Sequence, residues 1–306
     1  MIKRKYLFLI VDGNNHKIRD IAKFISQFQS NKRSLVSWLG NTATEIENQL
    51  REYINKQPRP FLQVALDDSG AIRGFLGIVF SDTNTVRLLG PYVTEIESEW
   101  DEISEELFRK ILEKYKLWKN VSLRVAFTRK NNHLNKFCKA HGFIQYNAER
   151  TLMLEKHEWQ RKESVTDDYS TGLVEIRPYR DADFSDFLNM HPKGAYFNAY
   201  YIVQNLNDIH HLIIASIGVR IVGYAYYEDF KADGFTEICF LNVLKSEQNK
   251  RIGTKLIKKA IEDSFPKSEI KKIQISVRLE NTAAFCLYQR FGFKEVVTYF
   301  AYELKF

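Results

Sequence analysis

Residues 237–259 combine three features that together could bind an anion. A run of β-forming residues from Ile238 to Val243 predicts a strand. A basic, polar loop follows at 245–251, and apolar residues at helical spacing from Ile252 onward predict an amphipathic helix. The first amides of a helix lack partners within it, and the helix dipole favours negative charge beside them. This stretch therefore predicts an anion site at the start of the helix.

Two sequence blocks resemble one known family. The loop Gln248-Asn249-Lys250-Arg251-Ile252-Gly253 resembles the Q/R-x-x-G-x-G/A loop of the GNAT N-acetyltransferases, which cradles the pyrophosphate of acetyl-coenzyme A. The block Asn281–Phe293 resembles the family's later pattern, an Asn, a Tyr seven residues on (Tyr288) and then Gly-Phe. Arg251 departs from the pattern, because it replaces the first glycine of the loop; its side chain could contact phosphate instead.

The resemblance implies where the cofactor binds. Acetyl-coenzyme A is expected where the predicted strands 235–243 and 271–277 diverge, with its pantetheine paired to backbone groups and its pyrophosphate at the helix start. Asn281 also suits a simple helix N-cap, and both roles are compatible. No metal is expected. The expected cofactor-binding residues are Leu241, Asn242, Val243, Gln248, Asn249, Lys250, Arg251, Ile252, Gly253, Thr254 and Asn281.

Two catalytic roles are also implied by the resemblance. Glu237 matches the glutamate that takes the amine proton in histone-acetylating members, although it equally suits a solvent-facing glutamate on a strand. Tyr288 matches the acid that protonates the departing thiolate; the alternative is a core aromatic on an amphipathic helix. A backbone amide near Leu241 to Val243 would polarise the thioester carbonyl, and a deprotonated amine would attack directly.

The chain repeats one plan at a fixed spacing. Gly292 lies 292 − 142 = 150 residues after Gly142, and Asn281 follows Asn131 at the same spacing. This register predicts a domain duplication. We expect a first domain at 1–155, a polar linker at 156–171 and a second domain at 172–306.

The two halves differ where the cofactor loop would lie. Opposite 248–253 the first half has Glu99-Trp-Asp-Glu-Ile-Ser104, whose carboxylates would repel a pyrophosphate. Opposite Tyr288 it has Cys138. The sequence therefore predicts a degenerate first domain without cofactor binding and a catalytic second domain.

Each half is expected to be α+β, with a mixed, mostly antiparallel sheet flanked by helices, as the resemblance also implies. Strands are expected at 6–11, 61–66, 74–80, 85–93, 121–127, 150–154, 173–179, 211–217, 219–227, 235–243, 271–277 and 295–306. Helices are expected at 16–29, 44–55, 103–114, 132–140, 181–190, 196–206, 252–263 and 282–291.

Composition narrows the partners. The net charge of +7 comes from basic residues dispersed among acidic ones, so nucleic acid is not the expected partner. No run of the sequence is long and apolar enough for a membrane span, and three cysteines without metal spacing indicate a cytoplasmic protein. His210 and His211 are expected to cap a surface turn.

The sequence thus predicts an acetyl-coenzyme A-dependent N-acetyltransferase acting on a primary amine of a small molecule or a peptide. The alternatives are a non-catalytic acyl-coenzyme A sensor or scaffold, and an aminoacyl-tRNA-dependent transferase. The aromatic segments 196–201 and 299–302 fall where the acceptor would bind, but core packing is the expected role of most of their rings.

Overall fold

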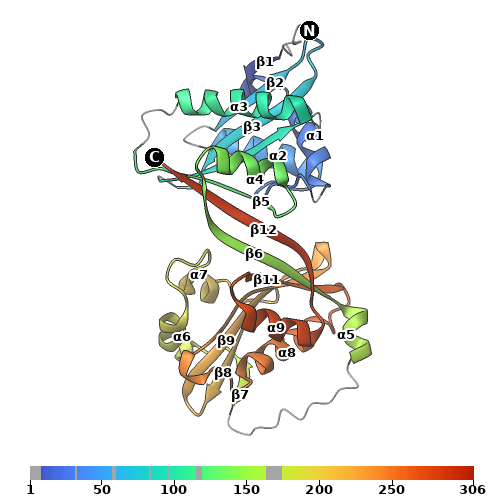
Figure 1. Ribbon diagram of the computed structural model, residues 1–306. Coiled ribbons are helices and arrows are strands. Elements are labelled where there is room, and N and C mark those ends of the chain that lie inside the picture. Colours follow the sequence, from blue (N-terminus) through green and yellow to red (C-terminus); the bar gives the residue numbers. More distant parts are fainter. Residues whose placement is uncertain are drawn as a thin grey trace. The chain divides into compact units, whose positions relative to one another are not determined.

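The computed structural model describes residues 8–31, 33–56, 60–82, 84–94, 97–114, 119–162 and 174–306. The chain forms two compact units, one of residues 1–148 with 297–306 and the other of residues 149–296. This division differs from the expected one, because each half contributes its last strand to the other unit. The strands concerned are β6 (Ile144–Glu155) and β12 (Lys294–Lys305), which have 12 residues each (Figure 1). The end of β6 pairs with β11 of the second unit, and the end of β12 pairs with β5 of the first.

The first unit is a mixed sheet with helices on both faces. Its strand order is β1-β2-β3-β4-β5-β12, and β4–β5 is the parallel pair. Its strands are β1 (Leu9–Asp12), β2 (Phe61–Leu66), β3 (Ile72–Phe80), β4 (Thr85–Val93) and β5 (Ser122–Thr128), with the end of β12. Its helices are η1 (Gly13–Asn15), α1 (Ile18–Gln29), α2 (Ala43–Asn55), α3 (Glu97–Lys114) and α4 (Asn132–Ala140).

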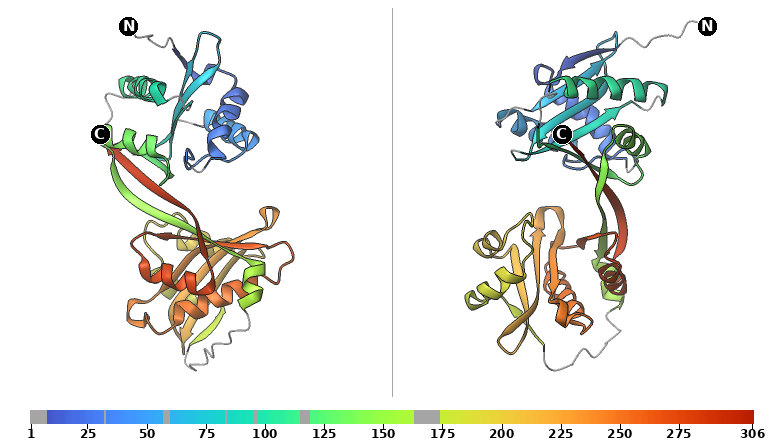
Figure 2. Two further views of the ribbon diagram at one scale, coloured as in Figure 1. Left: turned by 45° about the vertical axis from the view of Figure 1, so that its right-hand side comes forward. Right: turned by 60° about the vertical axis from the view of Figure 1, so that its left-hand side comes forward.

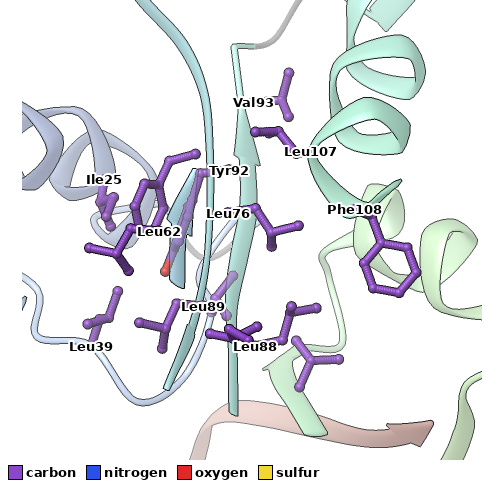
Figure 3. Close-up of a cluster of buried hydrophobic side chains, with 14 of the residues drawn as sticks. Ile25, Leu39, Leu62, Leu76, Leu88, Leu89, Tyr92, Val93, Leu107 and Phe108 are labelled. Carbon is purple, nitrogen blue, oxygen red and sulfur yellow. The ribbon is translucent and has the colours of Figure 1, made fainter. Parts of the chain in front are cut away.

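Apolar side chains fill both faces of that sheet. Figure 3 shows Ile25 and Tyr92 on one side of the strands and Leu107 and Phe108 on the other. Strands covered on both faces lose the alternation of polar and apolar residues, which explains the continuous apolar runs of β3 and β4.

The second unit repeats this architecture. Its strand order is β6-β11-β10-β9-β8-β7, and β10–β11 is the parallel pair. Its strands are β7 (Glu175–Pro178), β8 (His210–Ile217), β9 (Arg220–Phe230), β10 (Phe235–Val243) and β11 (Lys272–Arg278), with the end of β6. Its helices are α5 (Lys156–Lys162), η2 (Asp181–Asp183), α6 (Phe184–Met190), α7 (Ala199–Gln204), η3 (Lys231–Asp233), η4 (Lys245–Glu247), α8 (Ile252–Ser264) and α9 (Thr282–Phe291).

Each face of this sheet is covered by its own apolar cluster. Helices α8 and α9 pack on one face around Leu256 and Ile257, and α6 and α7 cover the other around Phe187 and Tyr226 (Figure 2). Successive side chains of β10 therefore face different layers of helices, α8 and α9 on one side and α6 and α7 on the other.

The duplication is repeated in detail at α4 and α9. Asn131 and Asn281 are the N-caps, and the side-chain Oδ1 of each accepts a backbone N–H at 3.1 Å. Gly142 and Gly292 follow the helices with φ of 73° and 96°, a left-handed conformation that glycine adopts without strain. The α+β class predicted for both halves is confirmed.

Some expected elements differ from the observed ones. The first part of the predicted linker, residues 156–162, forms the helix α5 directly after β6. The prediction was wrong there because the segment is polar and has no apolar residues at helical spacing. The remainder of the linker, and the start of the first predicted strand, lie outside the described residues. His210 and His211 lie in β8, hydrogen-bonded to Tyr226 and Asp229, and do not cap a turn.

Candidate functional site

Strand β10 separates from β11 halfway along its length. Their parallel pairing runs from Phe235 with Lys272 to Ile238 with Ile275 and ends there, although β11 stays paired with β6 as far as Arg278. The register of β10 against β9 shifts between Ile238 and Phe240, which is a bulge. From that point to Val243, no strand of the described residues pairs with this edge of β10, which can therefore pair with an extended ligand.

A groove of about 610 Å³ lies beside this open edge. It runs from β10 past the start of α8 to the first turns of α9. Its lining includes ten of the eleven residues expected to bind the cofactor, namely Leu241, Asn242, Val243, Gln248, Asn249, Arg251, Ile252, Gly253, Thr254 and Asn281. The structure thus brings together residues that lie up to 40 positions apart in the sequence.

The eleventh residue is directed elsewhere. The Lys250 ammonium contacts the Glu247 carboxylate at 2.8 Å, and Arg220 contacts the same carboxylate at 2.9 Å. The hydrogen bond from Lys250 lowers the pKa of Glu247. The side chain of Lys250 therefore holds the loop onto η4 and does not line the groove.

The loop before α8 turns through two left-handed residues. Asn249 has φ of 64° and Arg251, the N-cap of α8, has φ of 59°. Asparagine is among the residues that tolerate this region, whereas a long side chain is strained there. Arg251 thus has the backbone conformation that the family's glycine would adopt freely, and Ile252, Gly253 and Thr254, the first residues of α8, line the groove.

Comparing two substitutions of Arg251 will measure this strain. We expect Arg251→Gly to be more stable than Arg251→Ala by about 1 kcal/mol, because only glycine avoids the left-handed penalty. Both variants remove the guanidinium, so charge does not enter the comparison. Thermal unfolding should place the Gly variant about 2–4 °C higher. Equal midpoints would contradict a strained N-cap.

Gly253 leaves space in the groove that a side chain would occupy. A Cβ at this position would lie 3.4 Å from Leu287, 3.8 Å from Leu241 and 3.9 Å from Val243. The backbone of Gly253 is ordinary helix, so its lack of a side chain has no conformational reason. This open space beside free helix amides fits a narrow chain that ends in phosphates, which is the form of coenzyme A.

The two expected catalytic side chains lie outside the groove lining. Tyr288 is 4% exposed, packs against Phe293 with ring centroids 6.0 Å apart and belongs to the apolar cluster under α8 and α9. Burial raises the pKa of its hydroxyl, so the group is protonated at neutral pH. Its neighbours in α9, Cys286 and Leu287, do line the groove.

Glu237 lies on β10 just before the bulge. It is half-buried, and Glu228 lies directly opposite it on β9 while Gln274 lies opposite on β11. Burial raises the pKa of the Glu237 carboxyl; a hydrogen bond from Gln274 opposes the change, and the charge of Glu228 adds to it. A glutamate with a raised pKa is suited to accept a proton from an amine near neutral pH.

Sequence reasoning missed Glu247 and five groove-lining residues of α9, namely Ala283, Ala284, Cys286, Leu287 and Arg290. The spacing of three, four and seven residues after Ala283 is that of one helix face, which the N-cap at Asn281 could have revealed. The aromatic segments have different surroundings. Tyr196 and Tyr200 are largely exposed, contrary to the expected core packing. The 299–302 segment does pack in a core: it lies in the first unit, where Tyr302 is buried and stacks on Phe127 with ring centroids 5.4 Å apart.

Aromatic residues of the first unit stand at sequence positions that match groove-lining residues of the second unit. At the spacing of the duplication, Asn249 corresponds to Trp100 (249 − 149), and Ala283 and Leu287 correspond to His133 and Phe137 (283 − 150 and 287 − 150). Trp100 stacks on His133 with centroids 5.0 Å apart and meets Phe137 edge-on at 6.1 Å.

The start of α3 is also acidic. The carboxylate of Glu99 is 2.7 Å from the Arg73 guanidinium and only 6% of the residue is exposed. The helix begins at Glu97, five residues before the position that matches Arg251, so the loop of the second unit has no counterpart here. Three rings and a buried carboxylate therefore stand at sequence positions that match groove-lining residues of the second unit.

The comparisons agree with this fold. Residues 173–293 match the acetyltransferase (GNAT) family. A GCN5-related N-acetyltransferase from Sphaerobacter thermophilus aligns over 97% of this chain and 95% of its own, with 12% identity and a TM-score of 0.64. A tandem GNAT protein from the clavulanic acid biosynthesis pathway aligns over 98% of both chains, with 12% identity and a TM-score of 0.59. No curated protein matches the sequence.

Residues 173–293 thus match an acyltransferase domain, the acetyltransferase (GNAT) domain. Over its whole length the chain has the fold of these two solved structures. Among the described residues, no helix has the length and apolar character to cross a membrane. The same part of the chain contains no group of three or more His, Cys, Asp or Glu side chains placed to hold a metal ion.

Proposed function

We propose that the chain is an acetyl-coenzyme A-dependent N-acetyltransferase whose second unit transfers acetyl to a primary amine of a small molecule or peptide. The observation that carries this proposal is the open edge of β10 leading into the groove at the start of α8. An unpaired strand edge next to free helix amides suits an extended amide-containing chain that ends in a pyrophosphate.

The residues of the chain divide the work. The edge from Leu241 to Val243 holds the pantetheine arm, and the amides from Gln248 to Thr254 hold the phosphates. The bound cofactor supplies an activated acyl thioester. Glu237 accepts the proton of the acceptor ammonium, and Tyr288 holds the proton that the departing thiolate needs. Positioning in the groove makes the amine attack effectively intramolecular.

The first unit is proposed to be a degenerate domain without cofactor binding. Trp100, His133 and Phe137 occupy the positions that line the groove in the second unit, and Glu99 adds a buried carboxylate. Coenzyme A would have to displace stacked rings, and the Glu99 carboxylate is already held by Arg73, so this guanidinium is not free to bind phosphate.

Thiol release during incubation with acetyl-coenzyme A and a panel of primary amines tests the activity. We expect amine-dependent thiol release by the full chain. Calorimetric titration with coenzyme A should give a stoichiometry of one. A stoichiometry of two would contradict the degenerate first unit, and tight binding without release for any amine would indicate a non-catalytic acyl-coenzyme A sensor.

A further inference from the structure

Two carboxylates lie side by side on the sheet face that α6 and α7 cover. Glu237 on β10 is directly opposite Glu228 on β9, and Glu228 is 7% exposed. Like charges directly opposite each other across a ladder destabilise a sheet, and more so when water is excluded. The pair lowers the stability of the folded protein, and a bound positive charge would relieve the repulsion between the two carboxylates.

Few positively charged side chains of the described residues lie near the two glutamates. Glu228 accepts a hydrogen bond from the Tyr226 hydroxyl at 2.6 Å, and the Nδ1 of His210 is 3.4 Å from its carboxylate. In the same described residues, neither glutamate forms an ion pair with a lysine or an arginine. By contrast, Asp229 on the opposite face of β9 contacts Lys267 and His211.

Aromatic rings lie on the same sheet face as the carboxylates. Tyr196 stacks on Phe240 with centroids 5.0 Å apart, and Phe240 also lies 6.4 Å from Tyr226. The Tyr196 side chain is largely exposed as a whole, but desolvation of its hydroxyl raises the pKa of this group, and Cys239, Glu237 and Glu228 raise it further. Ring faces attract cations, most strongly where water is partly excluded.

This cluster adjoins the groove through β10. Asn242, two residues beyond Phe240, lines the groove, and its side-chain amide donates to the carbonyl of Met190 at the end of α6 at 2.9 Å. A molecule bound among the rings therefore lies next to the open strand edge, where an acyl group would arrive.

We propose that Glu228, Glu237, Tyr196 and Phe240 form a cation subsite that selects diamines and longer polyamines as acceptors. The proposal rests on the proposed acetyltransferase function. The reacting ammonium gives one proton to Glu237 and becomes the neutral amine. The second ammonium of the same molecule stays paired with Glu228 throughout, which a monoamine or an amino sugar cannot do.

Calorimetry on the protein saturated with coenzyme A tests this selection without requiring turnover. We expect 1,4-diaminobutane to bind at least about tenfold more tightly than butylamine or glucosamine. In Glu228→Gln the diamine and butylamine should bind within about twofold of each other. The matched control Glu262→Gln removes a carboxylate from the exposed side of α8 and should retain the tenfold preference.

A second variant keeps the test valid if Glu228→Gln, a substitution at a buried position, fails to fold. Tyr196→Leu changes an exposed ring and is expected to weaken the diamine about threefold or more, by loss of the cation–ring contact. Equal binding of diamine and butylamine to the unaltered protein, or a preference that survives Glu228→Gln, would overturn the subsite. Absence of thiol release with any amine would instead overturn the proposed function, and selective diamine binding would then still support the subsite.

Discussion

Replacing Glu237 by Gln is expected to lower kcat/KM for amine acetylation at pH 7 by about 10²–10³-fold, the range for loss of a general base. Glu237 is half-buried beside Glu228, and burial raises its pKa. In the unaltered enzyme the carboxyl must be ionised to accept the amine proton. Activity should therefore rise with pH through a pKa above the ordinary value of 4.5 for a glutamic acid and then level off.

The pH profile of the variant distinguishes a base from a residue that only packs. Without Glu237 the enzyme must capture the neutral amine from solution, whose fraction rises about tenfold per pH unit below the amine's own pKa. The deficit of Glu237→Gln should shrink accordingly as pH rises. Asp233→Asn, a surface carboxylate before β10, is the control. A deficit that stays constant with pH would indicate a structural role instead.

The second large effect is expected at Gly253. In Gly253→Val the new methyl groups would fill the space between Leu287, Leu241 and Val243 that the groove leaves open. We expect the Kd for coenzyme A to rise about a hundredfold or more, equivalent to about 2.7 kcal/mol. Calorimetric titration of the purified full chain with coenzyme A measures it directly.

The fold should survive this change. The nearest atom to a Cβ at Gly253 is an ordinary van der Waals neighbour at 3.4 Å, and valine is no worse than glycine inside a helix. Lys258→Val places the same side chain on the partly exposed side of α8 and should bind coenzyme A normally. If Gly253→Val also binds normally while the thermal midpoint is unchanged, the groove does not hold the cofactor.

Local patterns predicted much of the second unit. The bounds of β10 and α9 agree with the predicted 235–243 and 282–291, because each is a stretch whose periodicity and end signals lie within a dozen residues. Ten of the eleven expected cofactor residues line one groove. They could be chosen from the sequence because a loop and the start of a helix are recognised from residues close together in the chain. The departure at Arg251 was also visible in the sequence, and its left-handed backbone follows the pattern.

Other features needed the tertiary structure. The apolar alternation of β6 and β12 fits either unit equally well, so only their observed pairing with β11 and β5 shows that the two halves exchange their last strands. In the same way, Trp100 reads as an ordinary residue near a helix start. Its contact with His133 and Phe137 brings together residues more than 30 positions apart.

The sequence by itself determined the α+β class, the duplication and the position of the turn before α8, because hydrogen-bonded turns, caps and helix starts depend on neighbours along the chain. Only the tertiary structure decided that Glu228 lies opposite Glu237, that Tyr196 stacks on Phe240 and that Trp100 stacks on His133. Pairing across strands and packing between helices join residues whose separation in sequence carries no local signal.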